Sequence, residues 1–289
     1  MRLALAAYHC QPFPGWAAHW SKVDRLVGEA AADLLVLPEY AALEAALVGG
    51  SRCDTPIAWR DLAAERSGEW VEHWRMAAQT HGCHILAGSG PVVTDAGVVN
   101  RAWLISPNGE VAHQDKLILT PYERREMDMI PGSALSLFDT ALGKIGVLIC
   151  YDSEFPLLAR TLVSAGADMI LVPSCTDAPA GQTRVRQSCR ARAIEGQCLI
   201  AQAPLVGAVP ECEIIDVSTG RTGVFCPPDY GLPPDGILAQ GETDVAGVLV
   251  TEIDPAAIAA PRGSGQVGNF AHWPEQEAWA GKVTTWPLV

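Results

Sequence analysis

An apolar run that ends abruptly in a cysteine is the feature that most constrains the fold of this chain. Residues 144–149, KIGVLI, are short, rich in β-branched side chains and bounded by turn residues, which is typical of a buried strand. Cys150 follows directly. Asp152 and Ser153 are residue types that cap helix N-termini, and Pro156 is tolerated in a first helical turn. The sequence therefore predicts a strand, a sharp turn at Cys150 and a helix that follows.

This position favours a reactive thiol at Cys150. A cysteine at the C-terminal end of a strand, beside the positive end of a helix dipole, is stabilised as the thiolate, which is the nucleophilic form. The alternative is a buried structural cysteine, because a free cysteine packs like a small hydrophobic residue. The rest of the chain has to decide between the two interpretations.

Strand and helix patterns alternate along the chain. The predicted strands cover residues 3–8, 34–37, 84–88, 98–106, 111–116, 133–140, 144–149, 168–172, 197–203 and 245–253, with weak strands in 214–226, and the predicted helices cover 20–32, 69–80, 153–165 and 182–195. Apolar strands that alternate with helices indicate an α/β fold with a sheet covered by helices. Because we find no linker-like segment, we expect one domain over residues 1–289, with a tail from about residue 255 that is extended or forms an interface.

Charge and composition argue against several classes of partner. The 33 acidic and 20 basic side chains give a formal net charge of −13, which disfavours nucleic acid or an anionic membrane surface as the main partner. No apolar stretch approaches the ~18 residues that a membrane span needs, and the first residues lack the pattern of a secretion signal. The nine cysteines show no framework spacing, so we expect reduced thiols and a cytoplasmic protein.

Three predicted strands are followed by side chains that could act together in catalysis. Glu39 follows LLVLP, Lys116 follows a hairpin that ends in HQD, and Cys150 follows KIGVLI. Sheets of α/β proteins place ligands and catalytic groups at the C-terminal ends of strands. A carboxylate can take the thiol proton and activate a water, an ammonium can stabilise an oxyanion, and a thiolate can attack an electrophilic carbon.

These segments resemble the signature segments of the nitrilase superfamily of carbon–nitrogen hydrolases. The resemblance rests on LPEY, DKLILTPYERRE and GVLICYDSEFP, and it extends to NRAWLISPNGEVAHQDK and RARAIEGQCLIAQAP. It covers nearly the whole chain, from Leu3 to about Ile253. The residues of several segments resemble those of a branch of this superfamily whose members are often fused to an acyltransferase-like domain. We expect no such domain in this chain.

The resemblance implies a fold and an assembly. The fold is a four-layer α-β-β-α sandwich, usually paired through outer helices into homodimers or larger homo-oligomers. In this chain, helices 153–165 and 182–195 are the candidate interfaces, although either could be solvated. The resemblance implies no cofactor and no metal, and a small-molecule amide or nitrile as the substrate.

The resemblance also implies roles for individual residues. Glu39 would be the general base, Lys116 the oxyanion-stabilising cation and Cys150 the nucleophile. Glu123, seven residues after the lysine, matches a second glutamate that the family places near the lysine and the substrate. The backbone N–H of Tyr151 would be the other oxyanion donor.

Three further motifs have competing interpretations. Cys175, in VPSCTD, either lines the substrate cavity near Cys150 or is buried in packing. The HGCH segment at 81–84 lacks a second pair of ligands at standard spacing, so we predict no metal site there. The GxGxxG string at 263–268 has neither an apolar strand before it nor a helical pattern after it, which indicates a flexible tail segment rather than a nucleotide site.

The function predicted from these residues is hydrolysis of a non-peptide C–N bond in a small carboxamide. Thiolate attack gives a tetrahedral adduct, release of ammonia or an amine leaves a thioester, and water activated by Glu39 hydrolyses that thioester. Hydrolysis of nitriles or N-carbamoyl amides would use the same residues and stays open. The alternative from another class is a non-catalytic binding or scaffold protein that keeps the fold but has no chemical need for the three side chains.

Overall fold

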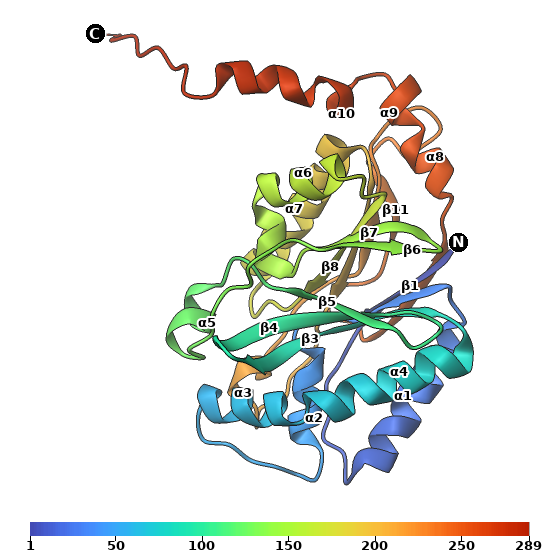
Figure 1. Ribbon diagram of the computed structural model, residues 1–289, viewed down its shortest axis with the longest axis vertical. Coiled ribbons are helices and arrows are strands. Elements are labelled where there is room, and N and C mark those ends of the chain that lie inside the picture. The colour runs from blue at the N-terminus through green and yellow to red at the C-terminus, as the bar shows by residue number, and fades with distance from the viewer. Residues whose placement is uncertain (289) are drawn as a thin grey trace.

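Two six-stranded sheets lie face to face at the centre of the protein, whose computed structural model describes residues 1–288 (Figure 1). The strand order of the first sheet is β12 (Gly247–Glu252), β1 (Arg2–Ala7), β2 (Leu34–Val36), β3 (His84–Thr94), β4 (Gly97–Ile105) and β5 (Val111–Asp115). The order of the second is β11 (Ile237–Gln240), β10 (Gly223–Phe225), β9 (Leu199–Pro204), β8 (Met169–Ser174), β7 (Gly143–Val147) and β6 (Leu137–Thr140).

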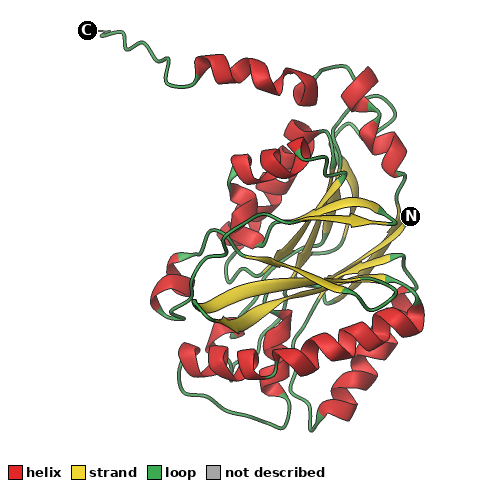
Figure 2. Ribbon diagram, viewed as in Figure 1, coloured by secondary structure: helices red, strands yellow, loops and turns green. Residues whose placement is uncertain are grey.

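Helices cover the outer face of each sheet (Figure 2). The first sheet carries α1 (Trp16–Ala30), α2 (Glu44–Leu47), α3 (Pro56–Glu65) and α4 (Ser67–His81), and the second carries α6 (Pro156–Ser164) and α7 (Pro179–Gly196). The short elements are α5 (Pro121–Arg125), α8 (Pro255–Ala259), α9 (Pro261–Ser264), α10 (Asn269–His272) and the 3₁₀ helices η1 (Ala41–Leu43), η2 (Cys150–Glu154), η3 (Glu213–Ile215) and η4 (Trp273–Trp279). The predicted α-β-β-α sandwich is confirmed.

The central strands are apolar on both faces because each sheet lies between a helix layer and the other sheet. In β1, Leu3 and Leu5 belong to the core that contains the strands of the second sheet. Ala4 and Ala6 alternate with them and belong to the core beneath α1 and α4. Successive side chains of a strand point to opposite faces, so a strand buried on both sides has to be apolar throughout.

Parallel pairing brings the ends of several strands to one place. β1, β2 and β3 are parallel neighbours in the first sheet, and β7, β8 and β9 are parallel neighbours in the second. The segments that follow β2 and β8 meet between the sheets, where the backbone N–H of Cys175 donates to the carboxylate of Glu39 at 3.0 Å. The architecture thus places the ends of strands from both sheets around a common site.

The helix that follows the cysteine begins later than predicted. Cys150 opens the 3₁₀ helix η2, and α6 begins at Pro156 without a side-chain cap. Asp152 and Ser153 therefore do not cap this helix, and that prediction was wrong. The hydroxyl of Ser153 donates to the carbonyl of Cys150 at 2.6 Å, and the carboxylate of Asp152 accepts from backbone N–H groups that include those of another segment.

The C-terminal segment is more helical than its sequence indicates. Gly263 lies in α9 and Gly268 directly precedes α10, so a helical turn follows the GxGxxG string where none was predicted. Each of these helices has only four residues, too few for a periodic pattern. Beyond η4 the chain runs away from the body of the molecule (Figure 1). Over residues 1–288, no helix has both the length and the apolar character needed to cross a membrane.

Candidate active site

The residues that the sequence singles out surround one cavity of about 790 Å³. Glu39 follows β2, Lys116 follows β5 and Cys150 begins η2 after β7, so the first two come from one sheet and the third from the other. All six predicted site residues line this cavity: Glu39, Lys116, Glu123, Cys150, Tyr151 and Cys175.

A buried ion triad forms the floor of the site. The ammonium of Lys116 lies 2.7 Å from Oε1 of Glu39 and 2.8 Å from each carboxylate oxygen of Glu123. Each of the three residues is only 1% exposed. A buried charge without a partner would be strongly destabilising, so the three groups depend on one another for their ionised forms.

Two side chains that the sequence reasoning missed complete this network. The amide Nδ2 of Asn100 donates to Oε1 of Glu39 at 3.0 Å and to Oε1 of Glu123 at 3.2 Å. The hydroxyl of Tyr40 donates to Oε1 of Glu123 at 2.7 Å. The available signal for Asn100 was a lone amide in the otherwise apolar first half of β4, and for Tyr40 it was only its place beside Glu39.

A local capping motif orients Glu123. Thr120 is the N-cap of α5, and its Oγ1 accepts from the backbone N–H of Glu123 at 3.2 Å. Oε2 of Glu123 accepts in return from the N–H and the hydroxyl of Thr120, at 2.8 and 2.9 Å. This is a capping box, with Pro121 in the first helical turn. The sequence TPYE therefore both starts α5 and points its glutamate back toward the lysine.

A glycine in β3 allows the loop of Glu39 to approach closely. Gly88 has a φ of +68°, and a Cβ there would lie 2.3 Å from the carbonyl oxygen of Pro38. The N–H of Ser89 donates to that same carbonyl at 3.1 Å. Only glycine fits a position that combines a left-handed backbone with such a contact. Tyr40, directly after the glutamate, also has a positive φ, of 59°.

Cys150 occupies a strained turn above this floor. Its φ is 47°, an uncommon conformation for a non-glycine residue that is often found at functional sites. Its Sγ donates to the carbonyl of Cys175 at 3.5 Å, and the N–H of Cys175 donates to Oε2 of Glu39. Cys175 thus does border the cavity near the other cysteine, but these two contacts use its backbone. Its thiol lies 3.9 Å from the hydroxyl of Ser218.

Burial decides the ionisation of these groups. It raises the pKa of Glu39 to about 7, and the charge of Glu123 adds to the increase while Lys116 opposes it. Burial alone would lower the pKa of Lys116, but the carboxylates of Glu123 and Glu39 outweigh burial and hold that pKa well above its usual value. Lys116 is therefore a permanent cation.

The thiol of Cys150 differs from the sequence prediction. Burial, reinforced by the charge of Glu39, raises the pKa of this thiol well above its usual value. The expected preference for the thiolate was wrong, because burial and the neighbouring carboxylate outweigh the effect of a helix dipole. At neutral pH the thiol keeps its proton, and a buried carboxylate with a pKa near neutrality shares its cavity and can accept that proton.

The sequence profile of the family described as carbon-nitrogen hydrolase matches residues 4–263. The chain belongs to this family. The predicted resemblance and the predicted class of enzyme are therefore confirmed. Whether the chain falls in the branch that is often fused to an acyltransferase-like domain stays a prediction.

Several named proteins are similar in sequence to this carbon–nitrogen hydrolase. It is 33% identical over 210 residues to the probable hydrolase YhcX of Bacillus subtilis, a match that covers 71% of this chain and 41% of that protein. It is 33% identical to the deaminated glutathione amidase of Yersinia enterocolitica, over 48% of this chain and 53% of that protein. The 2-oxoglutaramate amidase of Bacillus subtilis is 28% identical, and the match covers 77% of this chain and 78% of that protein. The chain thus spans about half the length of the first two relatives.

Solved structures share the fold of this carbon–nitrogen hydrolase. Nit3 of Saccharomyces cerevisiae, described as a member of branch 10 of the nitrilase superfamily, superposes with a TM-score of 0.70. The two chains are 21% identical, and the superposition covers 91% of this chain and 93% of Nit3. The NitFhit protein of C. elegans gives a TM-score of 0.71 at 21% identity, over 97% of this chain and 64% of that one.

The rim of the cavity that Cys150 lines is rich in carboxylates. The positive charge at the rim comes from the guanidinium of Arg184 in α7. Its Nε atom lies 3.4 Å from Oε2 of Glu154. The other rim carboxylates are those of Asp177, Glu213 and Asp216, which are exposed. An approaching substrate therefore meets more negative than positive charge.

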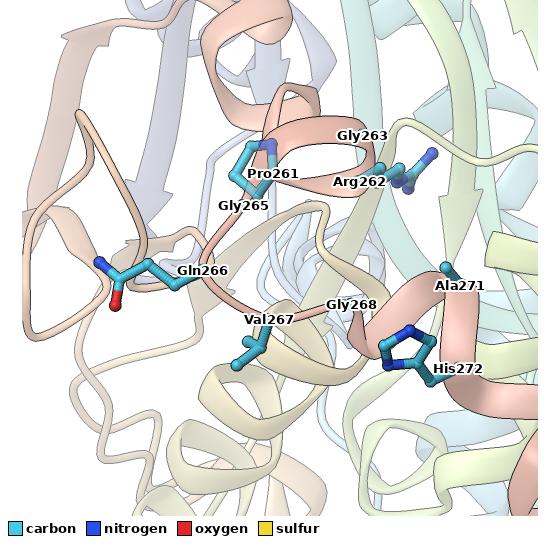
Figure 3. Close-up of a pocket in the computed structure, with 9 residues that line it drawn as sticks. All are labelled: Pro261, Arg262, Gly263, Gly265, Gln266, Val267, Gly268, Ala271 and His272. Atoms are coloured by element: carbon cyan, nitrogen blue, oxygen red, sulfur yellow. The ribbon is translucent and has the colours of Figure 1, made fainter.

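A second cavity of this hydrolase lies in the C-terminal segment (Figure 3). It has a volume of about 480 Å³ and is lined by residues of 261–272 that include Arg262 and His272. Its lining holds neither a thiol nor a carboxylate, so it lacks the groups for the chemistry described above. The described residues also contain no cluster of three histidine, cysteine, aspartate or glutamate side chains that could hold a metal ion.

Proposed function

We propose that this hydrolase cleaves the C–N bond of a small carboxamide, with Cys150 as the nucleophile. The observation that carries the proposal is the convergence of the thiol, the carboxylate of Glu39 and the buried ammonium of Lys116 on one cavity. Two of the relatives named above are amidases, which supports an amide as the substrate. A mutant of the amidase from Nesterenkonia sp. AN1, which has the same fold, is described with acrylamide added at its active-site cysteine.

In the first step Glu39 takes the proton of the Cys150 thiol while the sulfur attacks the carbonyl carbon of the amide. The carbonyl oxygen becomes an oxyanion, which the ammonium of Lys116 stabilises. The backbone N–H of Tyr151 is the second donor, because it lies in the first turn of η2, where N–H groups have no acceptor within the helix. Donors held in place before the reaction need no reorganisation when the charge develops.

In the second step the tetrahedral adduct collapses. Glu39 returns its proton to the departing nitrogen, the C–N bond breaks, and ammonia or an amine leaves while the acyl group stays on sulfur as a thioester. Glu39 then takes a proton from a water molecule, which attacks the thioester carbon. The C–S bond breaks, the carboxylic acid is released, and the thiol regains its proton, so one water is consumed for each amide.

Glu123 has a supporting role in this scheme. Its carboxylate holds the ammonium of Lys116 through two short contacts and is itself held by Thr120 and Tyr40. The lysine therefore stays charged even when Glu39 is protonated in the course of the reaction. A cation that loses neither charge nor position throughout the cycle can stabilise both tetrahedral adducts.

Nitriles and N-carbamoyl compounds would use the same three residues and are the second choice of substrate. The direct test is the release of ammonia from a panel of aliphatic amides, ω-amides, N-carbamoyl compounds and nitriles. Cys150→Ala is the catalytic variant, and Cys198→Ala, which alters a buried cysteine outside the cavity, is the matched control. We expect release by the wild type and Cys198→Ala and none by Cys150→Ala.

The other outcomes separate the remaining hypotheses. Equal release by the wild type and Cys150→Ala would show that another group is the nucleophile. Release from nitriles but not from amides would replace the proposed substrate class and leave the mechanism of sulfur attack in place. No release from any compound, with a folded protein and a cavity that still binds amides, would favour the non-catalytic binding protein.

A further inference from the structure

Asp152 is a buried carboxylate that joins two distant segments of the site. Its Oδ1 accepts from the backbone N–H of Ile118 at 2.8 Å and from that of Leu117 at 3.2 Å. Its Oδ2 accepts from the N–H of Leu117 at 3.3 Å and from that of Ile149 at 3.3 Å. The residue is 1% exposed. One side chain therefore receives hydrogen bonds from segments that lie more than thirty residues apart in the sequence.

Two of the three donors are direct neighbours of proposed catalytic residues. Leu117 follows Lys116, and Ile149 precedes Cys150. The backbone N–H of Lys116 donates to the carbonyl of Asn100 in the first sheet at 2.8 Å, and its carbonyl accepts from the N–H of Gly132 at 2.8 Å. Asp152 connects this backbone to the second sheet, which carries the thiol. Its own side chain does not line the cavity, so it acts through its neighbours.

We propose that Asp152 is a positioning residue that fixes the ammonium of Lys116 relative to the sulfur of Cys150. The inference rests on the function proposed above, because it assigns Asp152 to that reaction. Attack on a carbonyl requires the sulfur and the oxyanion donor to lie on either side of the same small group. A displacement of about 1 Å between such groups can lower a rate by about a hundredfold. A carboxylate bonded to both backbones removes that freedom.

The charge of Asp152 makes this connection sensitive to pH. Burial raises the pKa of its carboxyl to about 6, although the three backbone donors and the charge of Lys116 act in the opposite direction. The donor residues Leu117, Ile118 and Ile149 are themselves apolar, and the titratable groups adjacent to them in the chain are Lys116 and the thiol of Cys150. Below about pH 6 the carboxyl gains a proton, and the oxygen that carries it no longer accepts freely from a backbone N–H. The connection then loosens.

The first test compares Asp152→Asn with Asp229→Asn. Asp229 is also buried and accepts from two backbone N–H groups, at 2.7 and 2.8 Å, but lies outside the cavity, so it is the matched control. We expect Asp152→Asn to lower kcat by about ten- to hundredfold with a much smaller change in KM, because groups are displaced and not removed. Asp229→Asn should keep the wild-type kcat. Wild-type kcat in folded Asp152→Asn would overturn the proposal.

The pH profile supplies a readout that a purely structural role would not move. In the wild type, the slope of log(kcat/KM) against pH on the acid limb should be one where only Glu39 gains a proton. It should increase to two below about pH 6, where Asp152 gains a proton as well. In Asp152→Asn it should keep a slope of one, since the second group is gone. An unchanged slope would also overturn the proposal.

A measurement on the wild type covers the case in which Asp152→Asn does not fold. The backbone amide resonances of Leu117, Ile118 and Ile149 should titrate together near pH 6. Amides that titrate separately, or that do not respond, would contradict the shared hydrogen-bonded carboxylate. This experiment needs no substrate. If the wild type hydrolyses nothing, the proposed function fails, whereas the titration still decides whether Asp152 links the two segments.

Discussion

The ammonium nitrogen of Lys116 lies 2.7 Å from Oε1 of Glu39, and both side chains are almost fully buried. Glu123 holds the same ammonium from its other side at 2.8 Å. A cation enclosed by two carboxylates keeps its charge in a region from which water is excluded. The relationship also works in reverse, because Lys116 lowers the pKa of Glu39 that burial would otherwise raise further.

Replacement of Lys116 by methionine removes this ammonium and keeps a long apolar side chain. We expect kcat to fall by about a hundredfold or more, since one of two oxyanion donors is lost. The pKa of Glu39 should rise because burial and Glu123 are then unopposed. Lys144→Met, at an exposed position of β7, is the control for loss of a positive charge. Comparable kcat values for the two variants would exclude Lys116 from catalysis.

The acid limb of the pH profile should report Glu39. The base has to be ionised before it can take the thiol proton, and burial raises its pKa to about 7. We therefore expect kcat/KM to fall as the pH decreases through about 7, since protonated Glu39 is inactive. Circular dichroism over the same range checks that the protein stays folded. A midpoint near the ordinary value for glutamate, 4.5, would contradict the raised pKa of Glu39.

A methyl group at Gly88 should damage the site from a distance. Both Gly88 and Gly82 have a positive φ, +68° and +67°, but only Gly88 has an atom in the way, the carbonyl oxygen of Pro38. Gly82→Ala should cost roughly 1–2 kcal/mol of unfolding free energy from backbone strain alone. Gly88→Ala should cost more and also lower kcat, because the loop of Glu39 has to move. Urea denaturation and kinetics measure both, and equal behaviour of the two variants would contradict the close approach.

The acidic rim should influence which amides react fastest. The double variant Glu213→Gln and Asp216→Asn removes two rim charges, and Glu29→Gln with Glu65→Gln removes two exposed charges from helices outside the cavity. A matched series, 4-aminobutanamide, pentanamide and glutaramate, presents a cationic, a neutral and an anionic end. We expect the rim variant to lower kcat/KM for the first and to raise it for the third by about two- to fivefold at low salt.

The control keeps this prediction specific. Both double variants change the net charge equally, so an effect of the whole protein's field would appear in both. Pentanamide should respond to neither. If the rim variant and the control behave alike toward the cationic and anionic amides, the rim charges do not act on the substrate.

Much of the site follows from local sequence patterns. The apolar runs before Glu39 and Cys150 predict buried strands, and a side chain directly after a buried strand has few places to go other than the sheet edge. Thr120 and Glu123 form a capping box whose spacing is visible in the sequence. For the two strands the signal and the structure lie within a few residues of one another, which is why the sequence sufficed. The capping box has an equally local signal that the prediction did not use.

The remainder depends on contacts that no local pattern records. Asn100 lies 61 residues from Glu39 in the sequence, yet its side-chain amide donates a hydrogen bond to that carboxylate. Asp152 looks like a helix cap in the sequence and instead accepts from the segment after Lys116, 34 residues away. The thiol pKa was mispredicted for the same reason, since burial and the charge of Glu39 come from tertiary structure. A sequence shows which groups are available but not what surrounds them.

Glu123 offers the most stringent test of the coupled charges. Its carboxylate raises the pKa of Glu39, whereas Lys116 lowers it. Glu123→Gln should therefore shift the acid midpoint of kcat/KM below about 7, opposite to the shift expected for Lys116→Met. The rate itself should fall as well, because a glutamine has one acceptor oxygen in place of two and can no longer hold both the lysine and Thr120.

The direction of the midpoint shift separates this electrostatic role from a loss of structure, because a merely disturbed site lowers the rate without moving the midpoint in a charge-dependent direction. Glu126→Gln, an exposed glutamate at the end of the same short helix, controls for the change in net charge. Opposite shifts for the variants of Glu123 and Lys116, with none for Glu126, would establish that Glu39 is the titrating base. Identical midpoints in all three would assign the acid limb to a group outside the triad.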